Sequence, residues 1–245
     1  MSKYIDKEQS VATHLIELRQ RLLRCFMAVL IIFLCLFYFA NELYTWLSAP
    51  LSTLLPEGTS MIATDVTSPF FAPFKLTLVL SAFLAMPFLL HQAWSFIAPG
   101  LYLHEKRLAI PLLLSSIFLF YLGISFAYFV VFPLIFDFFT SVGPENIAVM
   151  TDISSYLNFV IKLFFAFGIV FEIPVATLLL LWSRVVSVEE LTSKRAYVIV
   201  GCFVLGMLMT PPDIISQSLL AVPMWMLFEL GILLGGLIVK HTTRD

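Results

Sequence analysis

Long apolar stretches separated by short polar segments run along most of the chain. Six of them carry few charges, at residues 22–40, 75–96, 108–132, 154–182, 196–210 and 214–239. A bilayer core of about 30 Å is crossed by roughly 20 helical residues, and a helix satisfies its own backbone hydrogen bonds there. The pattern therefore predicts an all-α polytopic membrane protein with six transmembrane helices, built as a single integral membrane domain over residues 1–245.

Composition agrees with this class and excludes others. Hydrophobic residues make up 60% of the 245 positions and charged residues only 12%, which is too apolar for a soluble domain of this length. The formal net charge of −2 gives no basic field for nucleic acid, so no nucleic-acid partner is expected. The polar N-terminal segment lacks the features of a cleaved signal peptide. Three cysteines, Cys25, Cys35 and Cys202, lie in apolar stretches without metal-site spacing.

The distribution of Lys and Arg predicts the orientation. Twelve of the 14 fall in or next to the N-terminal segment, the second and fourth connections and the C-terminal tail. The first, third and fifth connections contain no Lys or Arg, but they contain several acids. Because cytoplasmic segments carry the excess of positive charge, both termini are predicted to be cytoplasmic.

The short fifth stretch and the prolines in the apolar stretches give two further expectations. The fifth stretch has only 15 residues before Pro211, about 22 Å of helix, so we expect local thinning of the bilayer or a recessed turn. Prolines inside or at the ends of the stretches should bend the helices and give a curved bundle. These are Pro87, Pro111, Pro133, Pro174 and Pro223. Gly231 and Gly235 have the spacing that permits close helix packing.

Motif inspection indicates no enzyme. The sequence has no zinc-protease motif, phosphate-binding glycine loop or nucleophile elbow, so no catalytic residue, cofactor or metal is expected. The four histidines, at positions 14, 91, 104 and 241, lack ligand spacing and are interpreted as solvated or interfacial side chains.

Three charged residues lie well inside the apolar stretches, away from their ends, where charge is costly and therefore indicates function or a partner. Glu172 lies near the middle of the fourth stretch and is the stronger candidate. Glu229 lies closer to the cytoplasmic end of the sixth, where it reaches the headgroups or pairs with a neighbouring helix. Lys162 lies about eight residues inside the fourth stretch, deep enough to need a partner or a water-accessible surface.

Two acids on the predicted cytoplasmic side, Glu17 and Glu105, are further candidates. Glu17 precedes Arg21 by four residues, the spacing of a helical ion pair, and this pair alone is compatible with an ordinary solvated helix surface. Glu105 by itself is compatible with an ordinary loop acid. The residues alone thus leave the substrate open.

Several separated motifs nevertheless resemble the TatC family, the multispanning subunit of the twin-arginine protein translocase. The similarity extends from about residue 13 to residue 239. The matching segments are HLIELRQRL, SAPL, SPFFAPFKL, FIAPGLYLHEKR, FEIPVA, TPPDIISQ and AVPMWMLFE. The resemblance implies six helices in a curved, glove-like bundle in the bacterial cytoplasmic (inner) membrane. It also implies export of folded proteins that carry a twin-arginine signal peptide.

The resemblance also implies site residues. Glu17, Glu105, Phe96 and Leu101 match the family's signal-binding positions. Glu172, Thr210 and Gln217 match positions that contact the single-span partners TatA and TatB. Pro50 matches a functionally important position, and Asp213 matches the acid of the outer turn. Further TatC copies are also implied as partners.

The chemistry of the two acids fits this resemblance, and the resemblance also implies an energy source. Carboxylates bind planar guanidinium groups through paired hydrogen bonds, so two acids suit two arginines. Without a nucleotide site, the resemblance implies the proton-motive force as the driving force. A secondary transporter or channel for a small solute is the alternative, motivated by Glu172, Lys162 and the proline-broken stretches, but the sequence shows no repeated halves. A structural scaffold is a third class.

Overall fold

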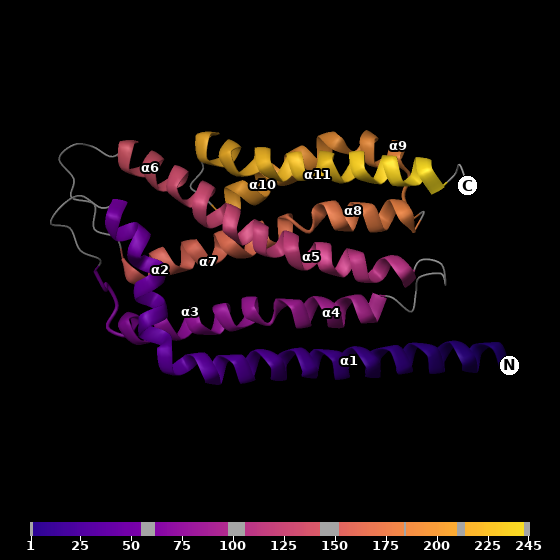
Figure 1. Cartoon of the computed structure of the whole chain (residues 1–245), viewed down its shortest axis with the longest axis horizontal. Helices are drawn as coiled ribbons and strands as arrows, with labels where there is room; N and C mark the ends of the chain where they lie inside the picture. The colour runs from indigo at the N-terminus through magenta and orange to yellow at the C-terminus, as the bar shows by residue number, and fades with distance from the viewer. Residues whose placement is uncertain are drawn as a thin grey trace. The chain divides into compact units, whose positions relative to one another are not determined.

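The structure is helical almost throughout. The computed structural model describes residues 2–54, 62–97, 106–142, 152–183, 185–209 and 214–242. Within these ranges the only β-type pairing is one isolated parallel bridge between Ile62 and Asp152. The helices (Figure 1) are α1 (Ser2–Leu36), a 3-10 turn (Phe37–Phe39), α2 (Ala40–Leu54), α3 (Ser68–Leu84), α4 (Met86–Ile97), α5 (Lys106–Phe126), a π-helix (Ala127–Val131), α6 (Phe132–Val142), α7 (Ile153–Val170), α8 (Ile173–Trp182), α9 (Val188–Ser193), α10 (Arg195–Met209) and α11 (Ile214–Thr242).

These helices confirm an all-α, multi-pass membrane protein. Four stretches are long and apolar enough to cross a bilayer: Thr13–Ser48, Ile110–Phe138, Ile153–Trp182 and Gln217–Leu237. α3 and α4 together make a fifth if the bent pair is counted as one span, and α10 is a shorter apolar helix. Each of the six predicted segments overlaps one of these elements. Six complete crossings and cytoplasmic termini stay predictions.

Prolines mark the breaks between consecutive helices. α3 and α4 are bent by 51° directly before Pro87. The π-helix ends two residues before Pro133, and α7 ends four residues before Pro174. Proline has no N–H to donate to the carbonyl four residues earlier, so the regular ladder is interrupted at each site. Two other prolines, Pro111 and Pro223, lie within α5 and α11, which continue past them.

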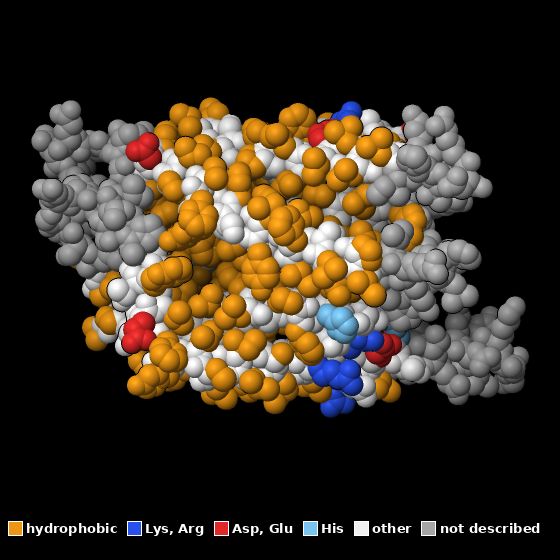
Figure 2. Space-filling model, viewed as in Figure 1, with side chains coloured by type: hydrophobic (Ala, Val, Ile, Leu, Met, Phe, Trp, Pro, Cys, Tyr) orange, Lys and Arg blue, Asp and Glu red, His pale blue; other side chains and the backbone are white. Residues whose placement is uncertain are grey.

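Contacts between residues divide the chain into two compact units. The first contains residues 1–47 and 69–117, and the second contains residues 48–68 and 118–245. On the face shown in Figure 2, hydrophobic side chains cover most of the surface of the described residues, and charged side chains are few. Such a surface is expected of helices that face lipid.

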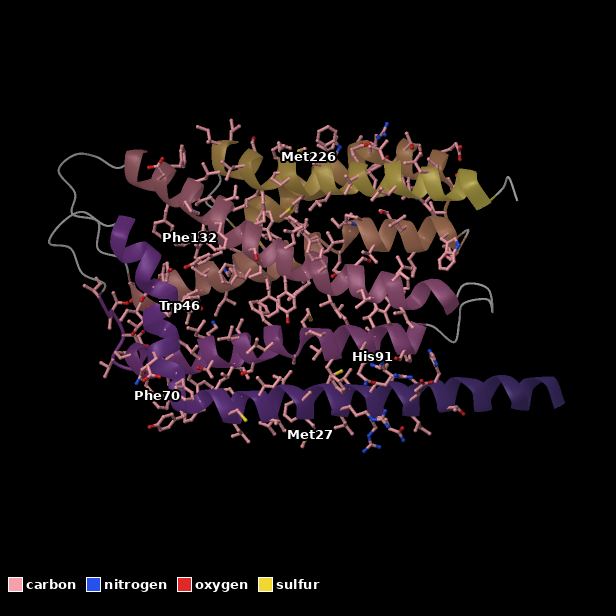
Figure 3. All side chains as sticks on the ribbon, in the orientation of Figure 1. Met27, Trp46, Phe70, His91, Phe132 and Met226 are labelled. Carbon is pink, nitrogen blue, oxygen red and sulfur yellow. The ribbon has the colours of Figure 1, made fainter. Side chains whose placement is uncertain are left out.

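In the first unit, α1 packs along α4 (Figure 1). Toward the other end of α1, the Phe33 ring meets the Phe74 ring of α3 edge-on at 5.2 Å. Met27 lies on the side of α1 that faces away from α4 (Figure 3), and its side chain is half exposed. α1 therefore has one packed face and one face open to the surroundings.

In the second unit, glycines let α11 pack closely against α8. A Cβ at Gly231 would overlap the side chain of Thr177, and a Cβ at Gly235 would overlap Leu181. The small-residue spacing predicted to permit close packing is thus used inside the subunit. Deeper in this unit, Phe120, Phe132 (Figure 3) and Phe167 are almost completely buried.

Residues 62–68 are joined to residues 152–155 by a set of polar contacts that we call the 62/152 clasp. The backbone nitrogen of Ile153 donates to the carbonyl of Ile62 at 2.9 Å. The hydroxyl of Ser154 donates to the hydroxyl of Ser68 at 2.7 Å. Ser68 is the first residue of α3 and Ser154 lies in the first turn of α7, so the clasp joins the starts of two helices.

Candidate functional site

Glu17 and Arg21 form an ion pair on α1. Arg21 donates from Nε at 3.0 Å and from Nη2 at 2.6 Å, and both bonds go to Oε1 of Glu17. The Glu17 side chain is 37% exposed and the Arg21 side chain 19%. The four-residue spacing predicted this pair, because side chains four positions apart share one face of a helix.

Arg21 also connects α1 to α4. Its Nη1 donates to the side-chain oxygen of Gln92 at 3.2 Å, and its Nη2 donates to the backbone carbonyl of Ser95 at 3.1 Å. Gln92 is buried. Figure 3 shows nitrogen- and oxygen-bearing side chains gathered between α1 and α4 near His91. The guanidinium therefore links the acid to the neighbouring helix.

Phe96 lies beside this network. Its ring stacks on the imidazole of His14, with ring centroids 4.3 Å apart and an interplanar angle of 23°. His14 precedes Glu17 by three residues, so both lie on one side of α1, and Phe96 follows Ser95 directly on α4. The structure thus brings together Glu17 and Phe96, two of the four predicted signal-binding residues.

Glu105 and Leu101, the other two, lie outside the described residues. Sequence reasoning missed His14, Gln92 and Ser95. The helical spacing between His14 and Glu17 is a signal that places His14 on the face of the acid. No local pattern indicates the contacts of Gln92 and Ser95 with Arg21, because 71 and 74 positions separate them along the chain.

Two of the three predicted partner-binding residues, Glu172 and Gln217, lie at helix ends. Glu172 is at the junction of α7 and α8, in the N-cap position of α8, and its Oε1 is buried. Gln217 lies in the first turn of α11, where its backbone is 3.3 Å from the Cβ position of Gly206 on α10. Pro50 is in helix α2, but its side chain is outside the described part, as are Thr210 and Asp213.

Two other embedded charges differ in their surroundings. Glu229 on α11 accepts a hydrogen bond from Nη2 of Arg195 on α10 at 2.7 Å, so it pairs with a neighbouring helix, one of the two interpretations of its position. Its second oxygen is buried without a hydrogen bond among the described residues. Lys162 is exposed on α7, and within the described ranges it forms no ion pair.

An apolar groove of about 540 Å³ lies in the second unit. Its walls come from the π-helix region and from the first part of α11, and Ser218 is its one polar lining residue. The described residues contain no group of three or more His, Cys, Asp or Glu placed to hold a metal ion.

The chain matches one protein family over most of its length. The family described as "Sec-independent protein translocase protein (TatC)" matches residues 13–223. The Sec-independent protein translocase protein TatC of Azotobacter chroococcum mcd 1 is 63% identical over 230 residues, which cover 94% of this chain and 90% of that protein. The protein of the same name from Escherichia coli (strain K12) is 59% identical over 228 residues, covering 93% and 88% respectively.

A solved structure has the same fold. The crystal structure of "Twin Arginine Translocase Receptor- TatC" superposes with a TM-score of 0.82 at 42% sequence identity. The match covers 91% of this chain and 98% of that one. The family match, over residues 13–223, includes Glu17, Phe96, Glu172 and Gln217.

Proposed function

Because the chain belongs to the TatC family of Sec-independent protein translocase proteins, we propose that it is the signal-recognising membrane subunit of a twin-arginine translocase. It binds the twin-arginine signal peptide of folded precursor proteins and, with TatA- and TatB-type single-span partners, exports them. It lies in the bacterial cytoplasmic membrane with both termini in the cytoplasm, as one integral domain. It performs no covalent catalysis, and the proton-motive force drives transport.

One observation supports signal recognition above the others, namely that Glu17 already binds a guanidinium. Two nitrogens of Arg21 lie within 3.0 Å of one Glu17 oxygen, so the carboxylate has the surroundings and orientation in which an arginine is bound. Glu17 is also partly exposed at the edge of the α1–α4 contact, where a peptide has access. Glu105 and Leu101 complete the proposed site with Glu17 and Phe96.

Phe96 supplies the apolar part of this proposed site. Its ring is half-buried and stacks on His14, and His14 lies one helical turn before Glu17 on α1. A signal peptide has apolar residues after its arginine pair, and an aromatic side chain beside a carboxylate suits both parts. The geometry therefore fits a ligand that is cationic at one point and apolar next to it.

A crosslinking experiment tests the proposal. A twin-arginine signal peptide carrying a photoreactive group is added to membranes that contain the full translocase with Glu17→Ala, Glu105→Ala or Glu189→Ala. Each of the first two changes should reduce crosslinking to the chain, because each removes one acceptor for an arginine. Glu17→Lys should reduce it further, because a cation there repels the peptide.

Glu189→Ala is the matched control, since Glu189 is an exposed acid in the first turn of α9 and is not one of the residues of the proposed site. It should crosslink as the wild type does. Wild-type crosslinking by both Glu17→Ala and Glu105→Ala would show that these acids do not bind the signal.

A further inference from the structure

The hydrogen bonds of Glu17 use only one of its two carboxylate oxygens, Oε1. A carboxylate offers about four acceptor positions, two on each oxygen. Arg21 donates twice to Oε1, from Nε at 3.0 Å and Nη2 at 2.6 Å, so this oxygen is fully used. Among the described residues, Oε2 accepts no hydrogen bond. Any further donor therefore meets Glu17 at Oε2.

Arg21 is held more firmly than the acid it binds. It also donates to Gln92 at 3.2 Å and to the Ser95 carbonyl at 3.1 Å, so α4 fixes the plane of its guanidinium. Its side chain is 19% exposed, compared with 37% for Glu17. Moving Arg21 away would break bonds to two helices, whereas Glu17 has no contact of this kind with α4. The arginine therefore orients the acid.

We propose that Arg21 is a positioning residue that leaves Glu17 room for a single guanidinium, bound through Oε2, and thereby sets the preference of the site for arginine. This inference rests on the proposed signal-binding function. A guanidinium has neighbouring N–H groups in one plane and donates two of them to a single oxygen, as Arg21 does to Oε1. An ammonium group lacks this planar pair, so it gains less from a fixed Oε2.

The same geometry limits Glu17 to one of the two signal arginines. A second guanidinium at Glu17 would need Oε1, which Arg21 occupies. The other arginine must therefore be bound elsewhere, and in the proposed site Glu105 is the acid available. Arg21 thus explains why a site for two adjacent arginines would use two separate acids.

An experiment can separate the preference of the site for arginine over lysine from the charge repulsion between Arg21 and the peptide. Arg21 repels an arginine and a lysine of the signal alike, because both carry one positive charge. The ratio of the affinities for an Arg-Arg peptide and a Lys-Lys peptide therefore cancels that repulsion and reports the positioning of Oε2. Both labelled peptides are titrated by fluorescence anisotropy against the full translocase in lipid nanodiscs.

Arg21→Lys keeps the charge but loses the planar pair of donors and the bonds to α4. We expect its Arg-Arg to Lys-Lys affinity ratio to fall by about tenfold, the effect of one charge-assisted hydrogen bond. Gln92→Leu removes one of the contacts that fix Arg21 and should lower the ratio in the same direction by a smaller factor. Gln92→Leu also tests the positioning role of Arg21 if the Arg21→Lys variant does not fold. Arg24→Gln removes a charge from the same helix without a described hydrogen bond and should keep the wild-type ratio.

A wild-type ratio in the folded Arg21→Lys and Gln92→Leu variants would overturn the inference. Glu17→Gln separates this failure from failure of the proposed function. If Glu17→Gln loses Arg-Arg binding while Arg21→Lys keeps the wild-type ratio, the acid binds the signal without positioning by Arg21. If Glu17→Gln binds the Arg-Arg peptide as the wild type does, Glu17 is not a signal-binding residue and both proposals are wrong at this position.

Discussion

Asp152 binds Thr64 through two hydrogen bonds to one carboxylate oxygen. Oδ1 accepts from the Thr64 backbone nitrogen at 3.1 Å and from its hydroxyl at 2.9 Å, across 88 positions of sequence. Oδ2 accepts from the backbone nitrogen of Ser155 at 2.8 Å, which caps the start of α7. These bonds, led by the one from the Thr64 backbone, hold the pKa of Asp152 far below its usual range. One charged side chain thus closes the 62/152 clasp and starts a helix.

The contribution of Asp152 to the stability of the folded protein should depend on pH only under acidic conditions. Because the pKa of this carboxyl is lowered in the folded state, its contribution is complete above the unfolded value of about 3.9 and is lost as pH falls toward the folded value. We expect Asp152→Asn to lower the Tm in mild detergent at neutral pH by a few degrees. The variant should also show a smaller drop in Tm below about pH 4 than the wild type.

Glu42→Gln serves as the control for Asp152→Asn, since Glu42 is an exposed acid on α2 without a described hydrogen bond. It should melt as the wild type does across the same pH range. Equal Tm values for Asp152→Asn and the wild type at neutral pH would contradict a stabilising role for the clasp.

The close packing of α8 and α11 predicts a contrast between neighbouring glycines. Gly231→Ala would push a methyl group into Thr177, and Gly235→Ala would push one into Leu181. Such overpacking costs typically about 1–3 kcal/mol. Gly236→Ala is the matched control, because nothing lies within 4 Å of its Cβ position. Thermal unfolding in detergent should rank Gly236→Ala beside the wild type and the other two below it, and equal stability of all three variants would exclude the packing.

Because α10 is short, we predict that its length is important for transport. It has 15 residues, from Arg195 to Met209. Inserting four Leu residues between Val198 and Leu208 would lengthen it by about 6 Å and remove the mismatch with the bilayer. We expect loss of export of a folded reporter with a twin-arginine signal. A variant with four existing residues replaced by Leu, at unchanged length, should export normally, and normal export by the lengthened, stably inserted chain would refute local thinning.

Glu172 and Gln217 should act together in binding a partner helix. Interhelical hydrogen bonds in membranes average about 0.6 kcal/mol, so loss of one contact weakens binding without abolishing it. Glu172→Ala or Gln217→Leu alone should reduce crosslinking to the TatA- or TatB-type partner, and the double variant should nearly remove it. Signal binding at Glu17 should persist in all three. If the double variant keeps wild-type partner crosslinking, these residues instead serve packing within the subunit.

The sequence predicted the local features of this fold. Apolar stretches located the helices, and Pro87 and Pro174 indicated two of their breaks, because both signals act within a few residues. The four-residue spacing of Glu17 and Arg21 likewise predicted their ion pair. Each of these depends only on helical periodicity or on the missing N–H of proline.

Features set by tertiary packing could not be predicted. The contacts of Arg21 with Gln92 and of His14 with Phe96 require α1 and α4 to lie side by side, and no periodicity encodes that pairing. The π-helix before Pro133 is equally hidden, since proline indicates a break but not its geometry. For the candidate site, sequence therefore indicated the acid and the aromatic residue but not the arginine network that orients the acid.

The ion pair between Arg195 and Glu229 has a consequence for the order of events during synthesis. The two residues are 34 positions apart, so the arginine leaves the ribosome before its carboxylate does. Under the proposed topology, Arg195 is therefore an unbalanced cation while α10 enters the bilayer, when positive charge holds a helix end in the cytoplasm. Once α11 has been made and packs beside α10, Glu229 balances that charge. The charge asymmetry that orients this part of the chain thus belongs to the nascent polypeptide and is reduced in the finished protein.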